Sequence, residues 1–435
     1  MRYVARPFQR FFRAAASGGI LLLISVVVAL GWANSRFSES YFHLWENPLT
    51  LGLGSFITEQ SLHFWINDAL MVIFFFAVGL EIKREFLAGE LSSRKAAILP
   101  IFAAAGGMVV PAVIYLAFNL GQPGQHGWGI PMATDIAFAI GVMAVLGRRI
   151  PFGIKIFLVA LAIVDDIGAV LVIALFYTGG VSWLALAAAG IIFGILIAAN
   201  KMGIRAIWVY LLLGFGLWLT VHESGVHATI AGVMLAMTIP SRLDVDAGEF
   251  VRVGKNLLAD FEKAGSWEND ILQNSERQVA LTELEAASRD LEAPLQRLER
   301  ILYPWVAFVI VPVFALSNAG VKIEGDFGQL LLGDRVVLGI IAGLVLGKQI
   351  GITLFSWVAV RLNLGSLPLG VTWRHVHGAS CLAGIGFTMS LFIAILAFSD
   401  VEMLDASKVG ILVASLASGV LGLILLLTAP GKSQR

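Results

Sequence analysis

Charged residues and cysteine are both scarce in this sequence. Only 14% of its 435 residues are Asp, Glu, Lys or Arg, whereas the average for soluble proteins is roughly 25%. The single cysteine, Cys381, excludes an intramolecular disulfide and is expected to pack between helices. Lysine plus arginine equal aspartate plus glutamate at 30 each, and this balance argues against a nucleic-acid partner. The composition therefore excludes an ordinary soluble domain.

Apolar residues dominate the rest of the chain. They make up 58% of it, and the mean hydropathy is +0.85. A bilayer span requires about 20 mostly apolar residues. The sequence predicts an all-α polytopic membrane protein with twelve transmembrane helices, near residues 16–33, 63–81, 96–119, 128–147, 152–176, 181–200, 203–220, 225–240, 302–320, 335–360, 376–398 and 408–428.

Lysine and arginine are distributed unevenly between the two sides of these spans. If the N-terminus is inside, 25 of the 30 lie in inward segments and four lie outside, namely Arg36, Lys322, Arg335 and Lys408. Cytoplasmic loops carry the excess of positive residues, so both termini are predicted to be cytoplasmic. The arginine-rich start followed by an apolar run favours an uncleaved first span over a secretory signal.

Residues 241–300 differ from the rest because they carry 21 of the 60 charged residues. We expect a cytoplasmic connector here, between spans 1 to 8 in residues 1–240 and spans 9 to 12 in residues 301–435. Pro294 is expected to begin or kink the last section of an amphipathic helix. Regulation and simple connection remain open as roles for this segment. The apolar residues that predict this helix recur at spacings typical of a helix and are Val279, Leu284, Leu291, Leu295, Leu298 and Leu302.

The segment outside between the first two spans carries an alternating, glycine-punctuated run. It covers residues 49–58 and follows Pro48. Alternation with glycine between two short runs predicts a β-hairpin.

Two adjacent acids, Asp165 and Asp166, lie in the middle of the apolar run 154–176. Each costs at least about 2.5–3.5 kcal/mol at the centre of a membrane helix, so such residues usually bind an ion or a proton or meet an opposite charge. Lys348 lies at a similar depth in the tenth span. Neighbouring helical residues point about 100° apart, so we expect one acid to face Lys348 and the other to face a bound cation.

Two spans are interrupted by helix breakers. Residues 127–135 (GWGIPMATD) interrupt the fourth span and residues 384–388 (GIGFT) the eleventh. Broken helices at corresponding places in two halves point to a transporter's binding site, where unwound backbone faces protein or water. Thr134 and Asp135 supply oxygen atoms, which small hard cations prefer.

Alternatives remain open for several of these residues. Asp135 either contacts the ion or only compensates helix ends, and Thr134 is either a ligand or a helix cap. Lys348 is either a proton carrier or a structural tether. His227 is either a titrating switch or a helix-end histidine. The acids in residues 79–85 (GLEIKRE) either anchor the topology or gather cations at a cytoplasmic rim.

Together these motifs resemble the NhaA family of bacterial sodium/proton antiporters, nearly end to end, and that family is among the standard examples of the broken-helix rule. The resemblance rests on residues 79–85, 134–139 (TDIAFA), 161–169 (LAIVDDIGA), 225–229 (GVHAT) and 384–390 (GIGFTMS). It implies inverted-topology repeats with two discontinuous crossing helices. It also implies an electrogenic exchanger of the inner membrane that expels Na⁺ or Li⁺ for protons, serves pH homeostasis and salt tolerance, and needs no cofactor.

The resemblance also implies roles for single residues. Asp165 and Asp166 bind the ion, with Asp166 the stronger candidate for direct ligation, Lys348 pairs with Asp165, and Thr134 and Asp135 lie at the helix crossing. A homodimer forms through the hairpin near residues 45–58. The resemblance further implies a pH-sensing rim that includes Glu81, Glu85 and Glu299. The full set of candidate regulatory residues is Glu81, Arg84, Glu85, His227, Glu299, Arg300 and Tyr303.

This chain departs from the family pattern in the sensor region. Well-known members carry histidines just after the acid that corresponds to Glu299, where this chain has Arg300 and Tyr303, and its connector is longer. We therefore predict a shifted pH profile.

Two other functions also place acids or Na⁺ sites within a membrane protein. An intramembrane aspartyl protease places its acids on separate helices in a Gly-x-Gly-Asp context, which is absent here. A sodium-coupled solute symporter on the same scaffold has less need of a competing buried cation, so Lys348 favours the antiporter.

Overall fold

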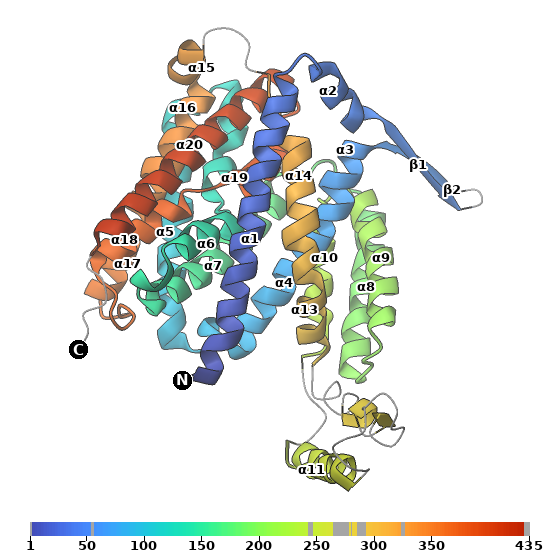
Figure 1. Ribbon diagram of the computed structural model, residues 1–435. Helices are drawn as coiled ribbons and strands as arrows, with labels where there is room; N and C mark the ends of the chain where they lie inside the picture. Colours follow the sequence, from blue (N-terminus) through green and yellow to red (C-terminus); the bar gives the residue numbers. More distant parts are fainter. Residues whose placement is uncertain are drawn as a thin grey trace.

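The computed structural model describes residues 2–53, 56–241, 247–263, 278–279, 281–284, 293–322 and 327–429. These residues form a bundle of long helices (Figure 1). The α-helices are α1 (Arg2–Ala33), α2 (Ser38–Glu46), α3 (Leu62–Phe64), α4 (Met71–Ala88), α5 (Arg94–Asn119), α6 (Ile136–Val145), α7 (Phe152–Phe176), α8 (Trp183–Lys201), α9 (Ile207–Glu223), α10 (Thr229–Thr238), α11 (Ala247–Lys263), α13 (Pro294–Trp305), α14 (Val311–Asn318), α15 (Phe327–Gly333), α16 (Arg335–Ile341), α17 (Lys348–Arg361), α18 (Trp373–Ala383), α19 (Phe387–Ala397) and α20 (Val401–Thr428).

Shorter helical turns of other types join these helices. Three are 3₁₀ turns, η2 (Glu90–Ser92), η3 (Pro123–Met132) and η4 (Gly147–Arg149), and three are π-helical, η1 (Trp65–Leu70), η6 (Val306–Ile310) and η7 (Ala342–Gly347). Short π-helical segments are often found at functional sites. Here Asp68 lies within η1, and Lys348 follows η7 directly.

Within the described residues, seven helices are long and apolar enough to cross a membrane, and up to ten spans result if each bent helix pair counts as one. The expected spans at 203–220 and 225–240 correspond to two shorter apolar helices, α9 and α10. The structure thus supports a polytopic membrane protein with seven to ten spans by length and composition.

Both expected helix breaks are present. The pair η3 and α6 and the pair α18 and α19 each bend by 44° at a break of a few residues. The two breaks meet, because the backbone N–H of Asp135 donates a 2.7 Å hydrogen bond to the carbonyl oxygen of Ile385. Glycine is required at this crossing, since a Cβ on Gly384 would lie 2.5 Å from the carbonyl oxygen of Leu344. A third bend, of 114° between α1 and α2, was not predicted.

Close contact between α5 and α17 places Lys348 at the centre of the bundle. A Cβ on Gly106 would collide with the carbonyl oxygen of Gly351, and the helix backbones therefore touch. Small residues allow such an approach between membrane helices. Pro111 of α5 packs in the same way against Gly347, the residue before Lys348.

The predicted hairpin is present as strands β1 (Pro48–Leu53) and β2 (Phe56–Ser61), which pair antiparallel from Pro48 opposite Ser61 to Leu53 opposite Phe56. Figure 1 shows it projecting away from the bundle. In the connector, α13 begins at Pro294 as expected, with Leu295 and Leu298 buried. Leu291 lies outside the described residues, and α11 was not predicted as a separate helix.

Figure 1 also relates the ends of the chain to the bundle. Helix α1 begins, and helix α20 ends, at the same end of the bundle, near which α11 also lies. The hairpin lies toward the opposite end.

Candidate ion-binding site

Helix α7 carries Asp165 and Asp166 near its middle and buries both, with exposed fractions of 1% and 3%. Because they are adjacent, they point in different directions. The ammonium Nζ of Lys348 lies 2.6 Å from Oδ2 of Asp165. The expected pairing of Lys348 with one of the two acids is therefore present.

A chain of hydrogen bonds ties this ion pair to both helix breaks. Nζ of Lys348 donates at 2.9 Å to the hydroxyl of Thr134, and that hydroxyl donates at 2.9 Å to the carbonyl oxygen of Ala383. Lys348 itself is fully buried. Oδ1 of Asp165 is buried without a hydrogen-bond partner among the described residues, so this oxygen keeps an unused acceptor position.

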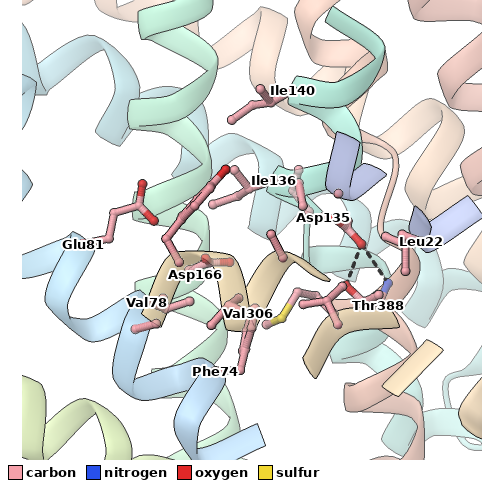
Figure 2. Close-up of a pocket in the computed structure, with 18 of the residues that line it drawn as sticks. Leu22, Phe74, Val78, Glu81, Asp135, Ile136, Ile140, Asp166, Val306 and Thr388 are labelled. Carbon is pink, nitrogen blue, oxygen red and sulfur yellow. Dashed lines mark hydrogen bonds between the residues drawn. The ribbon is translucent and has the colours of Figure 1, made fainter. Parts of the chain in front are cut away.

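Asp135 connects the N-termini of two half-helices. Its Oδ1 accepts a 2.9 Å hydrogen bond from the backbone N–H of Phe138 at the start of α6. Its Oδ2 accepts from the N–H of Thr388 at 3.2 Å, at the start of α19, and from the Thr388 hydroxyl at 2.6 Å (Figure 2). A carboxylate that caps two helix N-termini offsets both positive dipole ends. This geometry favours the compensating role for Asp135.

Asp166 faces a cavity instead of a protein partner. The cavity has a volume of about 100 Å³, and Figure 2 shows Asp166 in it between Glu81 on one side and Asp135 on the other. Within the described residues, the Asp166 carboxylate forms no hydrogen bond or ion pair. Since one water occupies roughly 30 Å³, a cation with a few waters fits. The polar lining comprises Glu81, Thr134, Asp135, Asp166, Glu299, Tyr303 and Thr388.

At one end of the cavity, Arg84 forms ion pairs with three acids. Its guanidinium lies 3.1 Å from Glu85, 3.4 Å from Glu299 and 3.8 Å from Glu81. We call these four residues the rim. Glu81 and Glu299 belong both to the rim and to the cavity lining, so the rim and the Asp166 carboxylate share one cavity.

The other residues proposed for pH sensing lie in different places. Tyr303 lines the cavity, whereas Arg300 is exposed on α13. His227 lies away from the rim, with Nε2 2.6 Å from the carbonyl oxygen of Tyr177. Sequence reasoning missed Thr388 as a site residue, although the motif containing it was recognised.

The described residues contain no group of three or more His, Cys, Asp or Glu side chains that could hold a metal ion. A transported cation would therefore rely on one or two carboxylates together with hydroxyl and carbonyl oxygens. That sparse oxygen set suits a weakly held alkali cation better than a resident metal.

Thr388→Val is expected to lower the free energy of unfolding by about 1–3 kcal/mol, because it leaves a buried carboxylate oxygen of Asp135 without its hydroxyl donor. Thermal or denaturant unfolding of the purified protein in detergent measures this. Thr388→Ser keeps the hydroxyl and is the control. Equal losses for both substitutions would show that packing, not the hydrogen bond, is responsible.

Buried carboxylates beside a buried lysine, at crossed helix breaks in a polytopic bundle, define a secondary active transporter of small cations. The chain belongs to the Na⁺/H⁺ antiporter 1 family, which matches residues 9–426.

Curated relatives agree along nearly the whole chain. The Na(+)/H(+) antiporter NhaA of Oleidesulfovibrio alaskensis is 49% identical over 420 residues, covering 97% of this chain and 93% of that protein. The protein of the same name from Koribacter versatilis is 50% identical, with coverages of 97% and 91%. That from Wolinella succinogenes is 47% identical, with coverages of 95% and 91%. As a family member, the chain is a multi-pass sodium/proton antiporter of the bacterial inner membrane and therefore a transporter.

Proposed function

We propose that this antiporter expels Na⁺ or Li⁺ electrogenically, with Asp166 as the carboxylate that binds the cation and the Lys348–Asp165 pair as a second proton-exchanging group. The observation that carries the proposal is the asymmetry of the two acids. Lys348 neutralises Asp165, whereas Asp166 faces the cavity without a partner. A cation reaching the cavity therefore meets an acid that is free to exchange its proton.

Competition between cation and proton explains how the exchange works. A cation that binds Asp166 displaces the proton from that carboxylate, since the two share the same oxygens. The cation also draws on Oδ1 of Asp165, which weakens the ion pair and allows Lys348 to release a proton. One cation is then exchanged for more than one proton, so each cycle moves net charge across the membrane.

A current measurement tests the charge movement. Proteoliposomes adsorbed to a solid-supported membrane are expected to show a transient current after a jump in Na⁺ or Li⁺, and none after a jump in K⁺. The sign of the current should correspond to more protons than cations moved in each cycle. A robust exchange of Na⁺ for protons without any current would contradict electrogenic transport.

We place twelve spans in the membrane, with both termini in the cytoplasm. The two short apolar helices and the three bent pairs supply the spans beyond seven. In support, α1 begins and α20 ends at the same end of the bundle (Figure 1). Residues 1–240 and 301–435 form the two membrane parts and 241–300 the cytoplasmic connector. The bent pairs η3–α6 and α18–α19 belong to inverted-topology repeats that cross at Asp135.

A homodimer is proposed to form through the hairpin. Strands β1 and β2 form a two-stranded sheet that stands away from the bundle, and exposed strand edges readily pair with another chain. Residues 54–55 at its tip lie outside the described residues.

The rim is proposed to set the pH at which exchange begins. Two of its acids, Glu81 and Glu299, line the cavity that Asp166 faces, so the charge state of the rim changes the local concentration of cations. His227 and the pair Arg300 and Tyr303 are proposed to modulate this response.

Arg84→Gln is expected to move the onset of activity by about one pH unit toward alkaline pH, the size of effect that one close charge partner usually has on proton binding. Without the guanidinium, proton binding to the three acids is no longer opposed by a cation. Exchange rates across a pH series in everted vesicles measure the onset. Arg297→Gln, at an exposed arginine of α13, is the control, and matching shifts in both variants would contradict a specific role for the rim.

A further inference from the structure

A further acid, Asp68, lies at the opposite end of the helical segment that carries three of the four rim residues. It belongs to η1, 13 residues before Glu81, which is about 20 Å along the helix axis at 1.5 Å per residue. The first residue of this helix that lines the cavity is Phe74, about 9 Å from Asp68 on the same basis. Asp68 therefore lies beyond the cavity, on the side away from the rim.

A histidine from another helix meets this acid. Nδ1 of His222, in the last turn of α9, lies 3.1 Å from Oδ2 of Asp68. The edge of the Phe64 ring meets the imidazole at 5.5 Å between centroids, and Trp218 stacks on it at 6.2 Å. These two aromatic rings hold Nδ1 toward the carboxylate.

The pair is partly open to solvent. The side chains of His222 and Asp68 are 38% and 25% exposed. The second ring nitrogen of His222, Nε2, forms no hydrogen bond within the part of the chain that the structure describes. One nitrogen thus faces the acid, while the other is free to exchange protons with water.

Two other histidines near Asp68 already contact oxygen atoms of other residues. His227, two residues before α10, is also close enough to act on the Asp68 charge, and it contacts the carbonyl oxygen of Tyr177 at 2.6 Å. On the α14 side, His63 contacts the side-chain oxygen of Asn318 at 2.8 Å. Within the described part of the chain, neither of these two histidines forms an ion pair with a carboxylate as His222 does.

We propose that His222 and Asp68 form a proton-uptake site on the outer side of the antiporter, an inference that depends on the membrane orientation proposed above. One proton from water binds Nε2, and the proton on Nδ1 passes to Oδ2 of Asp68. The imidazole ends neutral in its other tautomer and resets by exchange with water. The protonated carboxylate then supplies protons toward the cavity when the outer side opens.

Stability is a poor explanation for this pair. A partly exposed acid–histidine contact contributes about 1 kcal/mol or less, and a helix tie would not require an exposed ring nitrogen. The pair His43 and Glu46 provides a matched control, since it is also an acid–histidine contact on the hairpin side, but at 4.0 Å and 76% exposed.

The test uses the full-length protein in right-side-out membrane vesicles loaded with ²²Na⁺. The initial rate of Na⁺ efflux is measured while the external pH is varied at fixed lumenal pH. It is then measured while the lumenal pH is varied at fixed external pH. His222→Gln is expected to shift the external pH of half-maximal rate by about one unit or more and to leave the lumenal profile unchanged. His43→Gln is expected to leave both profiles unchanged.

His222→Arg separates proton transfer from charge alone. Arginine keeps a positive charge beside Asp68 but cannot release a proton. We therefore expect the arginine variant to show the same shift in the external pH profile as the glutamine variant. An arginine variant with the unsubstituted external profile would overturn the proposal. So would a glutamine variant whose two profiles are unchanged or shift together.

Labelling distinguishes failure of the site from failure of the orientation. Cys381 is fully buried, so His222→Cys is expected to add a thiol that a membrane-impermeant maleimide reaches from outside. Labelling only from inside would contradict the membrane orientation and the outer proton site together, whereas labelling from outside with an unchanged pH profile would contradict the site alone.

Discussion

Asp166→Asn is expected to abolish Na⁺- and Li⁺-driven proton release while leaving the protein at least as stable as the unsubstituted chain. The amide cannot lose a proton, so it cannot exchange one for a cation. In the unsubstituted protein, the Asp166 carboxylate faces the cavity without a partner among the described residues. Removing an unpaired buried charge relieves a desolvation cost, so the melting temperature should stay equal or rise.

This pair of readouts separates lost function from lost folding. Dequenching of a pH indicator in everted vesicles reports exchange, and thermal unfolding in detergent reports stability. Asp405→Asn is the control, since Asp405 pairs with Lys408 in a partly exposed position. Full exchange in the Asp166→Asn protein would falsify the assignment of the ion site.

Lys348→Ala is expected to lower the free energy of unfolding by about 3–5 kcal/mol, because it leaves the charge of Asp165 buried without compensation. It also removes the 2.9 Å hydrogen bond to Thr134, which links the ion pair to the helix crossing. Exchange should fail as well. Lys408→Ala breaks a partly exposed ion pair and is expected to cost below about 1 kcal/mol.

A double-mutant cycle assigns this cost to the pair. Asp165→Asn combined with Lys348→Ala should be less destabilising than the sum of the single substitutions, since neither then leaves a lone buried charge. Strict additivity, or an unchanged melting temperature in Lys348→Ala, would contradict a stabilising ion pair. Asp165→Asn alone is expected to retain, at best, exchange without its normal charge stoichiometry.

Features set by local chemistry could be predicted from the sequence. Glycine and proline marked the breaks at 127–135 and 384–388, alternation marked the hairpin, and Pro294 marked the start of α13. The buried acid pair and Lys348 stood out because charge is costly in an apolar span. Each of these inferences needs only a short window of sequence.

Features set by long-range packing could not be predicted. Thr388 meets Asp135 across 253 positions in the chain, and His222 meets Asp68 only because α9 packs beside η1. The π-helical turns and the bend between α1 and α2 also leave no clear local pattern. Helix α11 does carry one, since Val253, Leu257 and Phe261 recur every four residues, and the prediction overlooked it. The assignment of Lys348 to Asp165 instead of Asp166 rested on family resemblance, because helical spacing alone left both open.

The central claim is that a cation and protons compete for the Asp166 site. The most direct test adds Na⁺, Li⁺ or K⁺ to everted vesicles across a pH series and follows lumenal pH with and without a clamped membrane potential. Proton release with Na⁺ and Li⁺ but not K⁺, at a rate that depends on the potential, is the predicted result. Silence with all three cations in demonstrably folded protein would contradict the account and favour a solute symporter on this scaffold.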